Sequence, residues 1–160
     1  MPLTVKRITL WRADVQNEPG VLSRILEPLA AAGADLQVVM GYRFPTTPER
    51  SAVELYPVSG RRTTAAAGQA GLAASDIPCL LVEGDNRAGW GAEMARALAD
   101  AGINIAFLMA QVIGRRFAVA IGFEDDAAAA EAMKMIRKSG APARARRPPP
   151  GRGGGKRRRR

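Results

Sequence analysis

Apolar and polar positions follow one another in the same order twice along the chain. In the first half, they alternate over residues 8–11 and 36–40, and apolar residues recur at helical spacing over 21–29. Alternation turns one side of a strand inward, whereas spacing of three and four residues turns one stripe of a helix inward. With an apolar stretch over 51–58, the pattern predicts strand, helix, strand and strand.

The second half repeats this order. The pattern predicts a strand over 77–83, a helix over 90–101, and two strands over 103–112 and 117–123. A Gly-Arg pair between the last two strands is typical of a hairpin tip. A final helix is expected over 127–138, because two aspartates precede it and can cap its first turn.

The segment 61–75 leaves two interpretations open. It is rich in alanine, which favours a helix, but it contains Gly68 and Gly71. Each glycine destabilises a helix interior by roughly 0.5–1 kcal/mol relative to alanine. A continuous helix and a helix interrupted by a loop are therefore both expected here.

The two halves also share identical residues. A shift of 69 positions without gaps aligns these in order: Asn17 with Asn86, Gly20 with Gly89, Leu29-Ala30 with Leu98-Ala99, Ala32-Gly33 with Ala101-Gly102, and Met40 with Met109. Glycine thus stands at both ends of the helical segment in each half. Such order at a fixed period indicates an internal repeat.

A strand–helix–strand–strand–helix unit that occurs twice predicts an α+β fold of two tandem ferredoxin-like βαββαβ modules with antiparallel sheets. We place the modules at residues 1–72 and 73–140, followed by a tail at 141–160. A unit of about 70 residues is small for independent stability, and an exposed strand edge promotes aggregation. We therefore expect the two sheets to join edge to edge, with the helices on one face.

Two segments carry a resemblance to a known family. The run 17–22, Asn-Glu-Pro-Gly-Val-Leu, and the helix end 29–36 resemble the ACT domain, which shows an Asp-x-Pro-Gly-x-Leu turn and a helix ending in Gly-Ile-Asn-Ile. The second half is similar to the same pattern over 86–89 and 98–105. The resemblance covers about residues 5–138.

The chain departs from the family pattern at several positions. Asn17 and Asn86 replace the usual aspartate, Ala88 replaces the proline, and Asp35 stands where the pattern has asparagine. In the second half, Trp90-Gly91 replaces the usual aliphatic pair. These changes bear on the ligand and on whether both sites bind, and they leave the fold as predicted.

The resemblance implies a small-molecule site at each strand–helix turn, beside the neighbouring module. The first N–H groups of a helix have no intrahelical partner and can hold a carboxylate, and a glycine there lets a ligand approach the backbone. Asp35 is placed to meet a ligand ammonium. The expected ligand-binding residues are Asn17, Glu18, Pro19, Gly20, Val21, Leu22, Asp35, Asn86, Arg87, Ala88, Gly89, Trp90, Asn104 and Ile105.

A structural interpretation of the same residues stays open beside this one. Asn-x-Pro-Gly is also a capped strand-to-helix turn that binds nothing. Trp90 fits a hydrophobic core or an interface, and Arg87 fits a solvated charge.

Charge is concentrated at the end of the chain. The net charge is +9, yet residues 137–160 hold eleven of the 24 Lys and Arg and none of the 15 Asp and Glu, so residues 1–136 are slightly acidic. The tail has no large apolar side chain and is expected to be disordered. Polyanion contact, with nucleic acid or an anionic membrane surface, and simple solubilisation are both open. The contact residues would be Arg144, Arg146, Arg147, Arg152, Lys156, Arg157, Arg158, Arg159 and Arg160.

Composition argues against catalysis. The chain has no histidine, which removes the commonest general base and metal ligand. No metal-ligand cluster and no nucleophile–base pair is visible, so we expect no catalytic residues, no metal and no cofactor. Only a meeting of Glu54, Glu83 and Asp85 in one dry cleft would favour an enzyme. The single Cys79 and the absence of a signal or membrane-spanning segment suggest a cytoplasmic protein.

The sequence thus predicts a non-catalytic regulatory module that binds an amino acid or a similar small metabolite and passes its state to a partner. The alternative is a dimerisation scaffold that carries a basic tail to nucleic acid. A homodimer is compatible with both.

Overall fold

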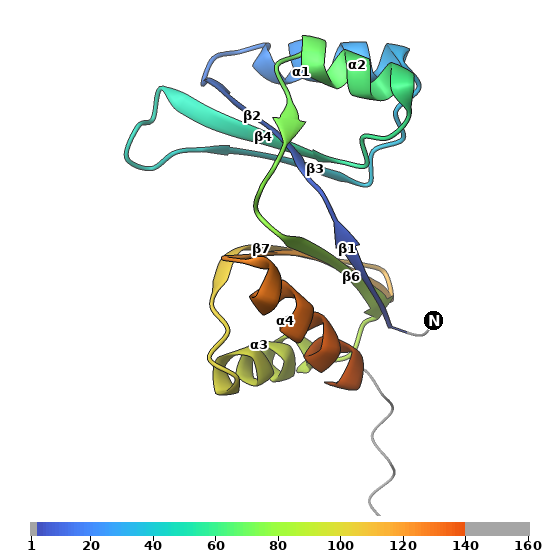
Figure 1. The fold of residues 1–160 in the computed structure, drawn as a ribbon, viewed down its shortest axis with the longest axis vertical. Coiled ribbons are helices and arrows are strands. Elements are labelled where there is room, and N and C mark those ends of the chain that lie inside the picture. The colour runs from blue at the N-terminus through green and yellow to red at the C-terminus, as the bar shows by residue number, and fades with distance from the viewer. Residues whose placement is uncertain (1–2, 140–160) are drawn as a thin grey trace, which may run out of the picture.

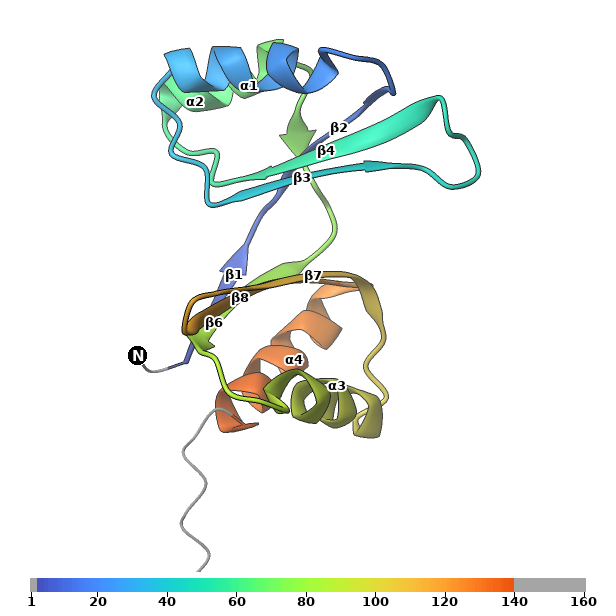
Figure 2. The same cartoon turned by 180° about the vertical axis from the view of Figure 1, so that it is seen from behind.

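The computed structural model describes residues 3–139, and within them the fold is mixed α+β, with two four-stranded antiparallel sheets and four helices. Figures 1 and 2 show the two sheets facing each other across the middle of the molecule, with a pair of helices on the outer side of each. The predicted class, an α+β fold of two tandem ferredoxin-like modules with antiparallel sheets, is confirmed.

The first sheet has the strand order β3–β4–β2–β5. Its strands are β2 (Trp11–Gln16), β3 (Val38–Arg43), β4 (Arg50–Tyr56) and β5 (Ala73–Ala74), and its helices are α1 (Val21–Ala31) and α2 (Arg61–Gln69). Apolar side chains from the sheet and both helices form one core: Ala13, Ile25, Leu29, Val53, Leu55, Ala66, Ala67 and Leu72. The alanine-rich segment therefore forms a helix that ends just before Gly71, where the backbone turns with a φ of 81°.

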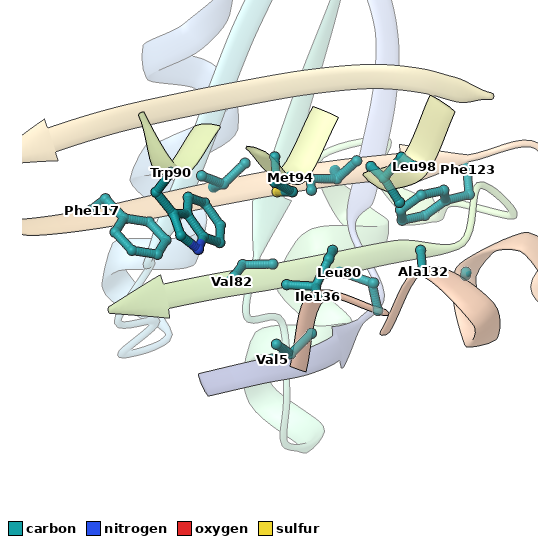
Figure 3. Packing of buried hydrophobic residues seen from close by; sticks show 13 residues of the cluster. Val5, Leu80, Val82, Trp90, Met94, Leu98, Phe117, Phe123, Ala132 and Ile136 are labelled. Carbon is teal, nitrogen blue, oxygen red and sulfur yellow. The ribbon is translucent and has the colours of Figure 1, made fainter. Parts of the chain in front are cut away.

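The second sheet has the order β1–β6–β8–β7. Its strands are β1 (Thr4–Ile8), β6 (Cys79–Asp85), β7 (Ile105–Ile113) and β8 (Arg116–Phe123), and its helices are α3 (Trp90–Asp100) and α4 (Asp126–Ser139). Figure 3 shows the core between this sheet and its helices, where Trp90, Met94 and Leu98 of α3 meet side chains of the strands and of α4. No helix within residues 3–139 is long and apolar enough to cross a membrane.

The first strand of the chain belongs to the second sheet. We expected a strand over 8–11 inside the first module, but the chain changes sheet there: Ile8 ends β1 and Trp11 begins β2. β1 pairs with β6 from Thr4 opposite Glu83 to Ile8 opposite Cys79. The segment between β1 and β6 is thus inserted between two neighbouring strands of the second sheet. Alternation alone shows which side of a strand is buried and says nothing about its neighbour.

The sheets do not join edge to edge, so this expectation is wrong. They are two separate sheets, packed through a cluster of buried residues from both: Ile8, Leu10, Val38, Cys79, Leu81 and Ala120. The helices consequently cover two opposite outer faces rather than one common face (Figure 1). The physical reason is that both sheets carry apolar residues on the side away from their helices, and face-to-face packing removes these from water.

Packing of the Phe107 ring of β7 against the neighbouring strand β8 requires a glycine at position 122, which is paired with Phe107 in the second sheet. A Cβ added at Gly122 would lie 2.9 Å from Cζ of Phe107 and closer still to Cδ1 and Cε1 of that ring. We expect Gly122→Ala to lower the free energy of unfolding by about 1–3 kcal/mol, the usual result of overpacking. Urea denaturation measures the change. Gly41→Ala is the matched control, because Gly41 also lies in a strand and has no atom within 4 Å of its added Cβ. Equal stability of the two variants would contradict the packing.

Candidate functional site

The two strand–helix turns have the same backbone conformation. Gly20 precedes α1 with a φ of 88° and Gly89 precedes α3 with a φ of 84°. This left-handed conformation favours glycine because it has no Cβ. Neither helix has a side-chain cap at its first turn. The N–H groups of Val21 and Trp90 donate to the backbone carbonyls of Glu18 and Arg87, so it is the N–H groups after them in the first turn that no side chain caps.

The paired asparagines are used differently in the two modules. The backbone N–H of Asn17 donates to the Glu49 carbonyl and that of Asn86 to the Arg115 carbonyl, each at 2.8 Å, so both tie their turn to the neighbouring hairpin. The Asn17 side chain also donates from Nδ2 to the Pro48 carbonyl at 2.9 Å. Asn86 lines a cleft instead.

An ion pair flanks each turn, with the charges reversed between the modules. Arg24 Nη2 lies 2.5 Å from Glu18 Oε1, whereas Arg87 Nη2 lies 2.5 Å from Glu93 Oε2. The hydrogen bonds from Arg87 hold the pKa of the Glu93 carboxyl below its ordinary value. Because these side chains are half-exposed, solvent screens the pairs and they add little stability. The guanidinium of Arg87, in the turn before α3, is thus paired with Glu93 of that helix.

The cleft lies between α3 and the edge strand β7 and has a volume of about 450 Å³. Two of the predicted residues line it, Asn86 and Trp90. The remaining lining residues come from α3 and the strands: Gly91, Met94, Ala95, Leu108, Ala110, Gln111, Val112, Phe117 and Val119. Sequence reasoning missed the residues on β7. Their alternation predicted a strand, but nothing in it indicated that the helix side of an edge strand stays uncovered.

Trp90 forms the inner wall of this cleft and is also part of the core. Its side chain is 8% exposed, and its ring stacks on Phe117 with a centroid distance of 4.3 Å and an interplanar angle of 28° (Figure 3). The core interpretation of Trp90 and its place in the cleft are therefore compatible. The stacked pair of rings forms the inner wall of the cleft.

The other predicted residues lie outside this cleft. Glu18 and Val21 line a separate cavity of about 400 Å³ beside α1, with charged Arg24. Asp35 is exposed in the loop that follows α1. Asn104 donates from Nδ2 to Glu124 Oε1 at 2.7 Å, and Ile105 is 38% exposed at the start of β7. The remaining predicted residues of the two turns are mostly exposed: Pro19, Gly20, Leu22, Arg87, Ala88 and Gly89.

A polar cluster on the inner face of the first sheet was also missed. Glu54 is 1% exposed, and its Oε1 accepts hydrogen bonds from the Tyr42 hydroxyl at 2.8 Å and from Arg12 Nη1 at 3.1 Å. Its Oε2 has no partner within the described residues. Burial, followed by the bond to Glu54, raises the pKa of Tyr42 to about 12.

The acidic residues considered for catalysis are not gathered into one site. Glu54 lies on β4 of the first sheet, whereas Glu83 and Asp85 lie on β6 of the second. Glu83 Oε2 is 3.6 Å from Lys6 Nζ. Over residues 3–139 no group of three or more Cys, Asp or Glu side chains is placed to hold a metal ion. The basic residues of the tail lie outside the described residues.

No protein-family description and no curated protein matches the chain. Solved structures do. Protein BT0572 from Bacteroides thetaiotaomicron superposes with a TM-score of 0.68 at 15% identity, covering 81% of this chain and 88% of the other. The ligand-free regulatory subunit of aspartate kinase from Thermus thermophilus gives 0.59 at 16% identity, covering 87% and 97%. Aspartokinase alpha and beta subunits give 0.58 at 18% identity, with the same coverage.

At these identities the likeness establishes the fold. The aspartate kinase regulatory subunits are ACT-domain proteins, and the likeness extends over both modules of this chain rather than one. The chain therefore has the fold of a tandem ACT-type protein.

Proposed function

We propose that this chain is a non-catalytic regulatory module that binds an amino acid or a similar small metabolite at the strand–helix turn of its second module. The observation that carries the proposal is the cleft of about 450 Å³ beside the first turn of α3. Its volume falls in the range of about 300–1,000 Å³ that is typical of small-molecule sites.

The cleft combines the two features that an amino acid needs. The uncapped N-terminus of α3 offers backbone N–H groups and a positive dipole end to a carboxylate. The amide of Asn86 offers both a donor and an acceptor beside it. Apolar walls complete the cleft, so a ligand can bury carbon while its polar end stays at the helix terminus.

Two observations favour a regulatory rather than a catalytic role. The structures that the fold resembles include regulatory subunits of aspartate kinase. The described residues also bring no nucleophile, base and metal ligands into the cleft: its only polar side chains are Asn86 and Gln111. Binding without reaction is what such a lining supports.

A second copy of the chain is the macromolecular partner that the surface favours. Of the large hydrophobic side chains exposed within residues 3–139, all but Leu22 lie on the edge strands β3 and β7. The sequence of β7 has no charged residue over its whole length, Ile105–Ile113. Natural edge strands usually carry charges or are covered, so self-association along these edges is part of the proposal.

Thermal unfolding in the presence of each of the twenty amino acids tests the binding function. We expect one or a few of them, at millimolar concentration, to raise the melting temperature. A ligand at about 100 times its dissociation constant adds roughly 2.7 kcal/mol of stability. A flat screen across the amino acids and common nucleotides would contradict the proposal and favour a scaffold for the basic tail.

A pair of glycine variants locates the site. Gly89→Leu should abolish the shift, because Gly89 lies between the cleft-lining residues Asn86 and Trp90, and a side chain at its positive φ strains the turn that positions them. Gly33→Leu is the matched control: its φ of 85° is nearly that of Gly89, so the backbone strain is similar, but it lies at the end of α1. Binding that survives in the Gly89 variant would place the site elsewhere. Removal of residues 141–160 should leave binding unchanged.

A further inference from the structure

Resting on the proposed function, we infer that the ligand carries an apolar side chain of aliphatic or aromatic type, and that only the second module accepts it. The inference concerns the class of ligand and the number of sites per chain. It follows from the chemistry of the cleft walls and from a comparison of equivalent positions in the two modules.

The walls of the cleft exclude a charged side chain. Leu108 and Val112 of β7 face α3 across the opening, and Met94 and Phe117 lie behind them. None of the lining residues is charged. A charged ligand group placed there would lose its hydration without gaining a partner, which is strongly unfavourable. A branched or aromatic side chain would instead remove apolar wall from water.

Three other cavities of the described chain differ in this respect. The cavity of about 350 Å³ near β5 is lined by Arg12, Asp14 and Asp76. The cavity beside α1 contains Glu18 and Arg24, and a smaller one of about 260 Å³ contains Glu83 and Arg116. Each therefore presents charges of both signs, whereas the cleft between α3 and β7 presents none.

Small residues on α3 create the space. Gly91 and Ala95 lie one turn apart on the side of the helix that lines the cleft. At the repeat distance of 69 residues, the first module has Leu22 and Leu26 at these two positions. Leu22 is 41% exposed and stands out from α1. The side chains that would fill the second cleft are thus present in the first module.

The strand residues that line the cleft also differ between the two modules. Val112 of β7 corresponds to Arg43 of β3, and Ala110 corresponds to Gly41. Val39 keeps an apolar side chain at the position of Leu108, but the first module carries a guanidinium at the position of Val112. The residues of the helix and those of the strand therefore both favour one apolar site per chain, in the second module.

The test uses the full chain and two variants. Gly91→Leu gives the second module the residue of the first. The variant should fold, because an added Cβ at Gly91 has no atom within 4 Å and leucine has a higher helix propensity than glycine. Leu22→Ala alters the equivalent, exposed position of the first module. Calorimetric titrations with leucine, isoleucine, valine, methionine and phenylalanine are compared with titrations of aspartate, lysine and serine.

We expect the wild type to bind one equivalent per chain of at least one apolar amino acid, and to bind it at least about tenfold more tightly than any of the three polar ones, since one or two methylene groups in an apolar pocket discriminate by this order. Gly91→Leu should weaken that affinity at least about tenfold while melting no lower than the wild type in the absence of ligand. Leu22→Ala should bind as the wild type does.

Three results would overturn the inference while leaving the proposed function intact: a polar amino acid that binds as tightly, two equivalents per chain, or full affinity in Gly91→Leu. A wild-type chain that binds none of the amino acids contradicts the proposed function itself. If that chain is also a dimer, and the Gly91→Leu variant is a monomer, the cleft is an interface between copies, and the inference fails with it.

Discussion

Replacing Arg12 by alanine should lower the free energy of unfolding by about 3–5 kcal/mol, because it leaves a buried carboxylate without its counter-charge. Glu54 is 1% exposed, and Arg12 Nη1 lies 3.1 Å from its Oε1. Among the described residues, the only other hydrogen bond to this carboxylate comes from the Tyr42 hydroxyl, at 2.8 Å. One neutral donor does not compensate for the hydration that a carboxylate loses on burial. Urea denaturation of wild type and variant measures the difference.

An exposed ion pair supplies the control. Arg24 pairs with Glu18, but both side chains are more than half exposed, so Arg24→Ala should change stability by only about 0–1 kcal/mol. A second variant separates charge from packing. Glu54→Gln in the Arg12→Met background removes the buried charge but keeps an acceptor for Tyr42, and it should recover most of the loss. If Arg12→Ala and Arg24→Ala were equally stable, the buried pair would not exist as described.

The Cys79 thiol should react with a disulfide reagent at least about a thousand times more slowly in the folded protein than in the unfolded chain. Burial raises the pKa of Cys79 from 9.0 to about 12, and the side chain is 0% exposed. At a fixed pH, three units of pKa lower the thiolate population by about 10³, and the thiolate is the reacting species. Absorbance of the released thiol at mildly alkaline pH follows the reaction, with urea-unfolded protein as the reference.

The same pKa predicts how stability depends on pH. The unfolded chain releases the Cys79 proton near pH 9.0, whereas the folded protein retains it until about pH 12. The contribution of Cys79 is therefore fully present below pH 9.0 and is lost as the pH rises through this interval, by up to about 1.4 kcal/mol per unit. Tyr42 acts in the same direction, since its pKa is also raised. Cys79→Val should show a shallower alkaline loss; an unchanged slope, or rapid labelling of the native thiol, would contradict the burial.

The local elements could be predicted from the sequence because their signals are local. Glycines aligned at a distance of 69 residues marked the turns, and Gly20 and Gly89 indeed have nearly the same positive φ. The helical spacing of Val21, Ile25 and Leu29 predicted the helix α1. The sequence left the conformation of the α2 segment undecided, because alanine favours a helix and glycine disfavours it. Burial of Ala66 and Ala67 against the first sheet stabilises the helix.

Only part of the candidate site could be predicted from the sequence. Asn86 and Trp90 belong to a motif that is contiguous in sequence, and they line the cleft. Leu108 and Val112 could not be assigned to it. Alternation places them on one side of a strand, but it does not tell whether that side faces the helices or the other sheet. Glu54 gave no sign of burial either, since a glutamate in a strand is ordinarily solvated.

What the sequence determined by itself is the module: its order of elements, its glycine turns and its duplication, all of which depend on residues a few positions apart. Only the tertiary structure decided that β1 leaves the first module to pair with β6, that the sheets meet face to face, and that β7 is an edge beside an open cleft. These choices depend on which distant surfaces bury the most apolar area together. That is a property of the whole chain in space, and no window of the sequence contains it.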